Sequence, residues 1–371
     1  MGIIRSLGRR GIPIYLLHDK NFCISRFSRY TKRFIKVPSA SNEFEFLDFM
    51  IKLAETEHVK DWILMPTNDA WVYLISKHKR TLQEYYRVPT PSWDVIKFAY
   101  DKRMTYLIAE KNDIPIPKTI YPKNIDDIYN IEDIQFPVII KGRIGHEFYK
   151  KTKTKVLKAK SFEELVQYYM RYSPHIDPSE TIIQEVIPGN SLTYSFCSFR
   201  NSELVAYWIG LKIREHPMGF GTGTFAQSVL VPELYELGKR FLDAINYYGI
   251  SEIEFKKDPR DGKFKLIEMN ARTWLWHTLA IRCGVDLPYI LYKDMIGEKI
   301  EPVKSFRENV KWIHFYTDVW VALKEIIRGN LTIRDYLKSL RGEKEFAVFS
   351  VDDPLPFIGE TVLLLYLWRT R

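Results

Sequence analysis

The sequence contains few cysteines and no long hydrophobic run, and each absence excludes a class of protein. No stretch of eighteen apolar residues occurs, so no membrane-spanning helix is predicted. Charged residues interrupt the first twenty positions, unlike the apolar core of a secretory signal peptide. The three cysteines are odd in number and far apart (Cys23, Cys197 and Cys283), which argues against a disulfide framework or a zinc site. We therefore expect a reduced, cytoplasmic protein.

The composition is typical of a folded, soluble chain. Apolar residues make up 46% and charged residues 27%, and both fractions are ordinary for globular proteins. Aromatic residues make up 15%, which is more than disordered segments usually carry. With 371 residues, the chain is long enough for two or three domains with separate cores.

The net charge of +9 is compatible with three kinds of surface. A basic surface attracts nucleic acid or acidic membranes. It also suits an enzyme whose substrates are all anions. A third interpretation is the lysine- and glutamate-rich surface of a heat-adapted protein, which the low number of glutamines favours weakly. Charge alone does not decide among the three.

The first 95 residues alternate short apolar runs with helical patterns, which predicts a parallel sheet with helices on its faces. Residues 2–8 resemble the end of a helix, yet no strand precedes them. We therefore expect the first strand of this sheet to be missing. The predicted buried strands are residues 12–17 and 62–66, and the predicted helices are residues 43–56 and 71–85.

Strands and helices continue to alternate up to about residue 302, whereas the last part, residues 303–371, is aromatic and basic and predicts no particular architecture. An antiparallel pair is expected at 193–199 and 204–213. The other predicted strands are 136–141, 181–186, 251–256 and 264–269, and the predicted helices are 92–112, 161–172 and 232–248.

The most informative segment is a predicted hairpin with acidic residues on both strands. Its turn, residues 258–262, contains the Asp-Pro-Arg-Asp-Gly sequence that is typical of hairpins. Adjacent strands place Glu254 and Glu268 close together, and Asn270 faces the same side two residues further on. Two carboxylates and an amide oxygen are hard ligands that suit magnesium bound to nucleotide phosphates. The sequence therefore predicts a magnesium site here.

Arg272 follows on the same face and could hold an anionic substrate or the transferred phosphoryl group. The alternative interpretation is a structural ion pair between Arg272 and a glutamate of the sheet. Asn270 in register with the two glutamates favours the functional interpretation.

The run Glu254-Phe255, followed by Glu268-Met269-Asn270-Ala271-Arg272, resembles the metal-binding signature of the ATP-grasp superfamily. Further motifs resemble that superfamily in the same order, namely Asp101-Lys102, the strand 136–141 that ends in Lys141, and residues 183–189. The most similar subgroup is that of carbamoyl-phosphate-synthetase-like or D-aspartate-ligase-like carboxylate–amine ligases.

The resemblance implies an α/β (α+β) ATP-grasp fold with a parallel-sheet domain ahead of it. On this basis residues 1–95 form the preceding Rossmann-like domain and residues 96–302 form the ATP-grasp domain. Its small lobe spans about 115–185 and its large lobe about 186–302, and residues 303–371 form a C-terminal extension.

The resemblance also implies a nucleotide site. Lys102 and Lys141 correspond to ATP-binding lysines, and a lone lysine at the end of a strand is otherwise usually just solvated. The adenine hinge is implied at Gln184, Glu185, Val186 and Ile187, with the Glu185 carbonyl and the Ile187 amide reading the base and the apolar side chains forming walls. The alternative is an ordinary edge strand that ends at Pro188-Gly189.

Two parts of this site depart from the family pattern. Asn190 and Ser191 stand where relatives often carry an acidic residue that holds the ribose, and we assign Ser191 to nucleotide binding. Many relatives have a glycine-rich loop over the phosphates after the second lysine, whereas this chain has a basic stretch there. Lys153 or Lys155 could hold a phosphate as a point charge. Most of this stretch is predicted to be a solvated strand face.

Lys212 and Arg214 alternate on one predicted strand, before a loop that contains three glycines at 219–223. Glycine amides can approach a phosphate closely. In ATP-grasp proteins a cation at this position meets the γ-phosphate, so both side chains are assigned to catalysis with Arg272. A flexible hairpin is the alternative. Three large rings that follow Arg272 could line the substrate pocket, although such rings are more often core: Trp274, Trp276 and His277.

The implied activity is ATP-dependent activation of a carboxylate as an acyl phosphate, followed by attack of an amine. The implied cofactors are ATP and two Mg²⁺ ions, with Mn²⁺ as an alternative, and the implied partners are small carboxylates and amines. No specific nucleic acid is expected, and a homodimer is compatible with the family. Two rivals stay open, namely a bicarbonate-activating carboxylase and a non-catalytic basic protein that binds nucleotides, nucleic acid or membrane.

Overall fold

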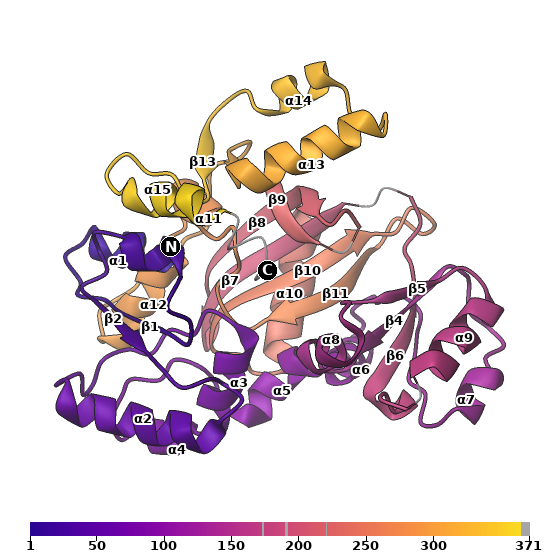
Figure 1. The fold of residues 1–371 in the computed structure, drawn as a ribbon, viewed down its shortest axis with the longest axis horizontal. Coiled ribbons are helices and arrows are strands. Elements are labelled where there is room, and N and C mark those ends of the chain that lie inside the picture. The colour runs from indigo at the N-terminus through magenta and orange to yellow at the C-terminus, as the bar shows by residue number, and fades with distance from the viewer. Residues whose placement is uncertain (173, 190–191, 220, 365–371) are drawn as a thin grey trace.

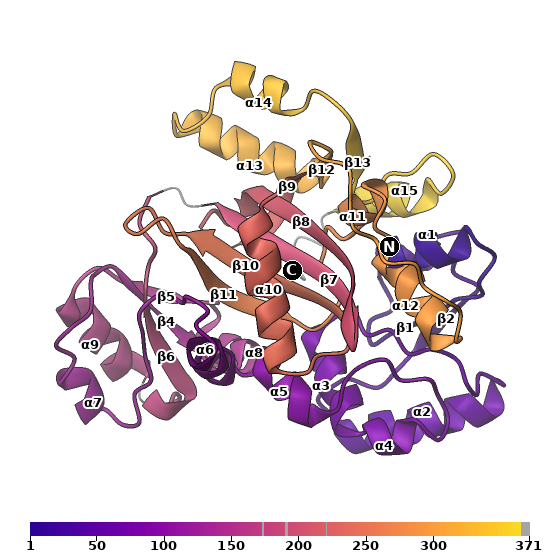
Figure 2. The same cartoon turned by 180° about the vertical axis from the view of Figure 1, so that it is seen from behind.

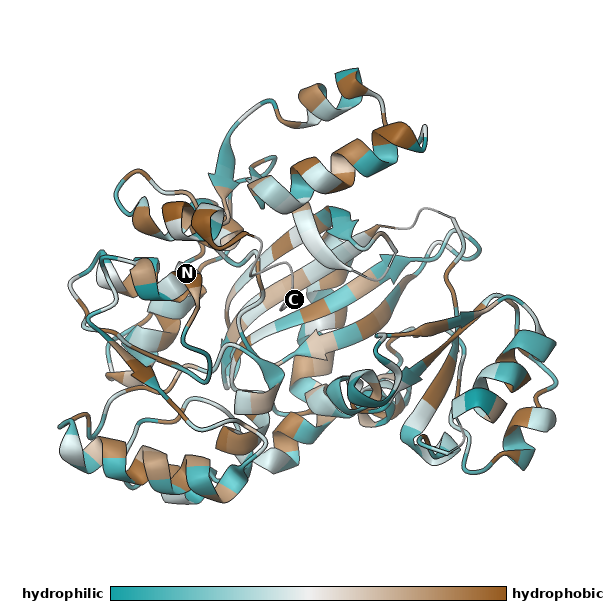
Figure 3. Cartoon of the chain, viewed as in Figure 1, coloured by the Kyte–Doolittle hydropathy of each residue, from teal (hydrophilic) through white to brown (hydrophobic). Residues whose placement is uncertain are grey.

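The computed structural model describes residues 1–172, 174–189, 192–219 and 221–364. Its architecture is built on a small four-stranded sheet, a large seven-stranded sheet and an N-terminal pair of strands (Figure 1). In Figure 3, apolar and polar residues alternate around the surface helices, as expected of helices with one packed face. Among the described residues, no helix is long and apolar enough to cross a membrane.

The N-terminal domain contains a two-stranded parallel sheet. The helix predicted at 43–56 is confirmed with the same bounds, and the Asn42 side chain caps its start. The helix predicted at 71–85 begins earlier and is interrupted at His78. The elements are α1 (Gly2–Gly8), β1 (Tyr15–His18), a 3-10 turn (Ile24–Phe27), β2 (Arg33–Lys36), α2 (Glu43–Thr56), α3 (Asp69–Lys77) and α4 (Lys79–Leu82).

Both predicted N-terminal strands need correction. The strand predicted at 12–17 begins only at Tyr15, and its side chains are partly rather than fully buried. Residues 62–66 form no strand. They make a single bridge, between Ile63 and Arg87, because Pro66 has no amide hydrogen to extend a ladder.

Two helices connect the N-terminal domain to the small sheet. They are α5 (Trp93–Tyr100) and α6 (Lys102–Lys111), and the single helix predicted at 92–112 is broken between them. Asp101 is extended at this break, and its carboxylate accepts a hydrogen bond from the Arg103 amide at the start of α6. The break places Lys102 at the first position of α6.

The small sheet has the strand order β3-β6-β4-β5 and is antiparallel throughout. The strands predicted at 136–141 and 181–186 are confirmed, shifted by one or two residues. The elements are β3 (Thr119–Ile120), α7 (Asp126–Tyr129), β4 (Val138–Gly142), α8 (Gly145–Thr152), β5 (Leu157–Ala159), α9 (Phe162–Tyr172), a 3-10 turn (Pro178–Glu180) and β6 (Thr181–Glu185).

The large sheet has the order β11-β10-β7-β8-β9-β12-β13. Its antiparallel part confirms the pair predicted at 193–213 and the hairpin at 251–269. Figure 2 shows α10 (Pro232–Ala244) lying across the back of this sheet, where its buried Phe241 and Leu234 pack with Phe196. The strands are β7 (Thr193–Asn201), β8 (Glu203–His216), β9 (Thr222–Ser228), β10 (Gly249–Lys257), β11 (Phe264–Asn270), β12 (Lys311–Ile313) and β13 (Lys344–Phe346).

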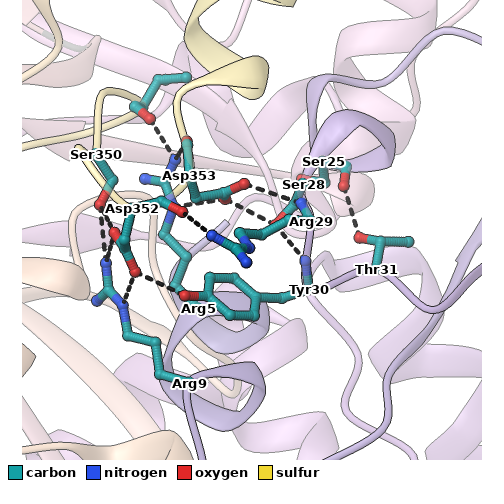
Figure 4. A network of polar contacts seen from close by, with 11 residues as sticks. Arg5, Arg9, Ser25, Ser28, Arg29, Tyr30, Thr31, Ser350, Asp352 and Asp353 are labelled. Carbon is teal, nitrogen blue, oxygen red and sulfur yellow. Dashed lines mark hydrogen bonds and ion pairs between the residues drawn. The ribbon is translucent and has the colours of Figure 1, made fainter. Parts of the chain in front are cut away.

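The sequence predicted no architecture for the residues beyond 302. They add two strands to this sheet and then pack against helix α1. Strands β12 and β13 extend the β9 edge of the sheet. Arg5 of α1 forms a buried ion pair of 3.0 Å with Asp353, and Arg9 pairs with Asp352 (Figure 4). The remaining helices are α11 (Thr278–Arg282), α12 (Leu287–Met295), α13 (Phe315–Ile327), α14 (Ile333–Ser339) and α15 (Leu355–Val362).

Candidate active site

A cavity of about 2270 Å³ lies where the small sheet, the large sheet and the N-terminal domain meet. Strand β4, the hairpin β10–β11 and the start of α3 all contribute to its walls. A pocket for one small molecule usually occupies about 300–1,000 Å³. The cavity therefore has room for a nucleotide and a second substrate together.

The hairpin β10–β11 brings the predicted acidic residues together at this cavity. Glu254 of β10 lies directly opposite Glu268 of β11 in the antiparallel register. Asn270 lies two residues further along β11, on the same face. The juxtaposition predicted from the turn sequence is therefore confirmed.

A third carboxylate, Glu252, belongs to the same cluster and was missed at the sequence level. It lies directly opposite Asn270 and is buried. Its Oε2 accepts a hydrogen bond of 2.9 Å from the Asn270 amide, and its Oε1 accepts one from the Ser195 hydroxyl. The Glu252 bond fixes the orientation of the Asn270 side chain. The signal was available, because Glu252 and Glu254 are two residues apart on one strand and so share a face.

Lys212 of β8 lies among these carboxylates. Its Nζ is 3.4 Å from both carboxylate oxygens of Glu254 and 3.4 Å from the nearest oxygen of Glu215. Burial would lower the pKa of the Lys212 ammonium, but the surrounding carboxylates outweigh burial and raise it. Burial and the charge of neighbouring carboxylates raise the pKa of Glu252 and of Glu254. These two carboxylates are therefore harder to ionise than in water, whereas at Glu268 the Lys102 and Lys141 ammonium groups outweigh burial and lower its pKa to about 2.

Two further lysines approach the cluster from the other side. Lys102 Nζ lies 3.4 Å from Glu268. Lys141, at the end of β4, is buried and donates a hydrogen bond of 2.6 Å to the Tyr106 hydroxyl. Burial, together with the nearby Lys102 ammonium, lowers the pKa of Lys141 to about 7. Tyr106 was not predicted, and it holds this lysine in place while donating to the Ile267 carbonyl.

The donor set fits a hard divalent cation. Glu254, Glu268 and Asn270 offer carboxylate and amide oxygens at neighbouring positions, which is the chemistry that Mg²⁺ prefers. Burial raises the pKa of Glu252 and of Glu254, and a cation bound beside them would favour their ionised forms. Within the described part of the chain, no three His, Cys, Asp or Glu side chains are already gathered as a metal site. In this structure lysines approach Glu254 and Glu268 instead.

The predicted hinge residues line the cavity at the end of β6. They are Gln184, Glu185, Val186 and Ile187. The Glu185 carboxylate forms an ion pair of 3.0 Å with Arg260. The Val186 amide donates a hydrogen bond to the Pro137 carbonyl. Ile187 is buried against the cavity wall. Ser191, which we assigned to the nucleotide, lies outside the described residues.

The first part of the basic stretch after Lys141 forms helix α8 instead of the solvated strand face that we predicted, whereas Lys158 is exposed on strand β5 as predicted. Burial of Phe148 on one face of the helix explains this difference. Lys153 ends α8 in a left-handed conformation, with φ of 59°. Both Lys153 and Lys155 line the cavity, where they could meet a phosphate.

Among the predicted site residues that the structure describes, Arg214 is the one that does not line the cavity. A register shift between β8 and β9 separates it from Lys212, so the alternation that we assumed does not hold. Its guanidinium forms two hydrogen bonds of 2.8 Å with Asp318 of α13, which is fully buried. Arg214 is not among the residues that line the cavity. Its assignment to catalysis is therefore corrected to a structural ion pair.

Arg272 lines the cavity and pairs with Asp69, a residue of the N-terminal domain, not with a sheet glutamate as our alternative supposed. Its Nε lies 2.7 Å from Asp69 Oδ1, and its Nη2 donates to Asp69 Oδ2 and to Asn270 Oδ1, both at 3.1 Å. Trp274 and Trp276 pack in the core around Trp208 while their edges reach the cavity. Burial lowers the pKa of the neighbouring His277 to about 4, so its ring is neutral near pH 7.

Comparison with known proteins finds distant relatives. No family model matches the chain. It is 25% identical over 286 residues to D-aspartate ligase of Enterococcus faecium (strain Aus0004), which covers 71% of this chain and 66% of that protein. It is 24% identical over 231 residues to the carbamoyl phosphate synthase large chain of Myxococcus xanthus (strain DK1622), covering 58% of this chain and 20% of that one. The chain thus spans just under two thirds of the first protein and a fifth of the second.

Solved structures of the same fold include two kinds of ligase and a carboxylase domain. The biotin carboxylase domain of Hydrogenobacter thermophilus 2-oxoglutarate carboxylase, solved with MgADP and bicarbonate, has a TM-score of 0.65 at 17% identity and covers 83% of this chain and 70% of its own. The L-amino acid ligase of Bacillus licheniformis scores 0.61 at 16% identity, covering 81% and 74%. The N5-carboxyaminoimidazole synthetase of Staphylococcus aureus scores 0.65 at 13% identity, covering 88% and 82%. At these identities the likeness concerns the fold alone, and it confirms the ATP-grasp fold class.

Proposed function

We propose that this chain, an ATP-grasp protein, is an ATP-dependent ligase that activates a carboxylate as an acyl phosphate and couples it to an amine. One observation carries the proposal. Three carboxylates and an amide occupy facing positions of one hairpin, and three lysines surround them at the wall of a single large cavity. Such a site can bind a triphosphate together with its metal ions and leave space for further substrates.

The lysines would orient the nucleotide. Lys141 and Lys102 approach from the small sheet and α6, and Lys212 approaches from the large sheet, so phosphates between them would be held from both sides. The hinge residues 184–187 would receive the adenine through main-chain groups, with Ile187 as an apolar wall. Lys153 and Lys155 are candidates for a further phosphate contact, and Ser191 for the ribose.

Glu254, Glu268 and Asn270 would hold Mg²⁺. We propose two ions, with Mn²⁺ as a substitute. Bound there, the metal would neutralise the charge on the transferring phosphoryl group. Glu252 would orient Asn270 through the hydrogen bond of 2.9 Å described above.

Arg272 and the glycine loop would act in the second step, in which the amine attacks the acyl phosphate. Arg272 is suited to bind a carboxylate with two parallel hydrogen bonds. The loop contributes Gly219, Gly221 and Gly223 to the cavity wall. The Gly219 amide donates to the Glu215 carboxylate, and the amides of the other two glycines could stabilise a tetrahedral oxyanion. Catalysis by such a site consists mainly of positioning and electrostatic stabilisation.

The domain division that we propose is unchanged, with residues 1–95, 96–302 and 303–371 as its three parts. The last part adds strands β12 and β13 to the large sheet, so we expect it to fold with the large lobe. A homodimer is a further proposal, which the dimeric carboxylase domain of H. thermophilus supports by analogy.

Phosphate release from ATP tests the proposal. The protein is incubated with Mg-ATP and pairs of amino acids, or with bicarbonate and an amine, and both ADP and the condensed product are measured. We expect phosphate release that depends on a carboxylate–amine pair and gives an amide. Release with bicarbonate alone would favour a carboxylase, and no release with any carboxylate would favour a binding protein.

A further inference from the structure

The ion pair between Asp69 and Arg272 joins two domains at the wall of the cavity, where both residues are exposed to its interior. We propose that this pair binds the acceptor as an amino acid, with Arg272 holding its carboxylate and Asp69 its amine. The proposal rests on the proposed ligase function and adds the class of acceptor to it.

The start of α3 aims Asp69 at the cavity. The Asn68 side chain accepts a hydrogen bond of 3.0 Å from the Trp71 amide and so fixes where the helix begins. Asp69 is the first residue of the helix, and its side chain is 53% exposed. A carboxylate at this end of a helix is also favoured by the helix dipole. Asp69 is therefore accessible to a cation that enters the cavity.

The surroundings of Asp69 suit an ammonium group. Tyr100 and His146 line the cavity close by, and their side chains are in contact at 3.3 Å. Burial, with the Tyr73 hydroxyl and the Asp69 and Glu147 charges as smaller causes, raises the pKa of Tyr100. An aromatic ring beside a carboxylate is the combination that attracts an organic ammonium.

An amino acid could replace each partner of the existing pair without leaving a charge uncompensated. Its carboxylate would take the place of Asp69 on Arg272, and its ammonium would take the place of Arg272 on Asp69. Arg272 would keep its hydrogen bond to Asn270, which would hold the acceptor beside the proposed metal site. Arg272 is largely buried, but the Asp69 side chain is half-exposed, so solvent screens the pair and limits its contribution to stability.

The proton balance of the coupling step assigns Asp69 a second task. The ammonium loses one proton to the Asp69 carboxylate, and the free nitrogen lone pair then forms the C–N bond with the acyl carbon. The bond from that carbon to the phosphate oxygen breaks, its electron pair leaves with the phosphate, and the phosphate takes the second proton of the nitrogen. The products are an amide and inorganic phosphate.

The test compares Asp69→Asn with a matched surface variant, Asp48→Asn, whose carboxylate is exposed on α2 and pairs with Lys52. Phosphate release is measured with the twenty L-amino acids, D-alanine and D-aspartate as acceptors, and the KM values for ATP, donor and acceptor are determined separately. We expect Asp69→Asn to raise the acceptor KM by about 10- to 100-fold, as for the loss of a hydrogen bond to a charged group, and to lower kcat as well because the proton acceptor is lost. The KM values for ATP and donor should stay within about twofold, and Asp48→Asn should change none of them.

Inhibition by the deaminated analogue of the best acceptor gives a second readout that a merely structural role would not change. The wild type should bind the amino acid more tightly than the analogue, and Asp69→Asn should bind the two equally. Asp69→Glu keeps the charge, so its acceptor KM should rise less than that of Asp69→Asn. This second variant keeps the proposal testable if Asp69→Asn does not fold.

An unchanged acceptor KM in Asp69→Asn, or an equal rise of all three KM values, would overturn the assignment of Asp69. A wild-type protein that uses only amines without a carboxylate would overturn it as well. Absence of phosphate release with every carboxylate would instead contradict the proposed function itself.

Discussion

The Lys212 ammonium lies 3.4 Å from both carboxylate oxygens of Glu254, in a cluster with three further glutamates, Glu215, Glu252 and Glu268. A single cation shared in this way keeps the carboxylates close together in the absence of nucleotide. If phosphates and a divalent cation bind here as we propose, the cation would supply positive charge to the carboxylates and Lys212 would be free to turn to the phosphates. The ion pairs of Lys212 would therefore stabilise the site before nucleotide binds and could be replaced by a bound metal ion.

Replacement of Lys212 should show how far the carboxylate cluster depends on its ammonium group. Lys212→Met leaves buried carboxylates without their shared cation, which should lower the free energy of unfolding by about 3 kcal/mol at pH 7. Because a divalent cation can compensate the same charge, Mg²⁺ should stabilise the variant more than the wild type. Urea denaturation with and without Mg²⁺ measures both effects. Equal stabilisation of the two proteins by Mg²⁺ would argue against cation binding at this cluster.

Glu268→Gln should abolish ATP turnover while the fold stays intact. The substitution preserves shape but removes a charge that would hold metal, so we expect turnover to fall by at least about 100-fold, the upper range for losing even an indirect metal contact. Glu203→Gln, at an exposed position on β8, is the matched control. Circular dichroism checks the fold, and ADP formation measures turnover. Wild-type turnover in Glu268→Gln would refute the metal assignment.

Lys141 should take up a proton when nucleotide binds. In the free protein its pKa is lowered to about 7, so at pH 8 most of the population is neutral. Phosphate beside Nζ favours the charged form and raises this pKa, and the protein therefore binds a proton above pH 7. Calorimetry of ADP binding in buffers of different ionisation enthalpy measures the uptake, and Lys141→Met should lack it. The same uptake in both proteins would place the phosphates elsewhere.

Arg214 should matter for stability and not for turnover. Arg214→Met leaves the fully buried Asp318 without its partner, which should cost about 3–5 kcal/mol. Adding Asp318→Leu removes the uncompensated charge and should restore part of the loss. Denaturation measures stability, and turnover per folded molecule should stay within about threefold of wild type. A folded but inactive Arg214→Met protein would return Arg214 to the catalytic residues.

The sequence predicted the acidic hairpin well because its determinants are local. A strong turn at 258–262 sets the register up to the pair Phe255–Leu266, and a bulge within the hairpin, between Phe255 and Glu254, then brings Glu254 opposite Glu268. The same locality explains why helix α2 was predicted with its observed bounds, since the Asn42 cap and its apolar spacing lie within the segment.

Features that depend on tertiary contacts were not predictable in this way. The bulge near Arg214 changes which face its side chain takes, and the acid that receives it, Asp318, lies 104 residues away. Asp69 meets Arg272 across 203 residues, so neither strand nor helix patterns indicate the pair. Helix α8 replaced the predicted strand face because Phe148 packs into the core of the small lobe.

The most direct test of the account is a crystal structure with a non-hydrolysable ATP analogue and Mn²⁺, whose anomalous signal identifies the metal. We predict manganese peaks bound by Glu254, Glu268 and Asn270, with phosphates between Lys141 and Lys212 and adenine against residues 184–187. A nucleotide bound outside the cavity, or manganese held by other side chains, would contradict it.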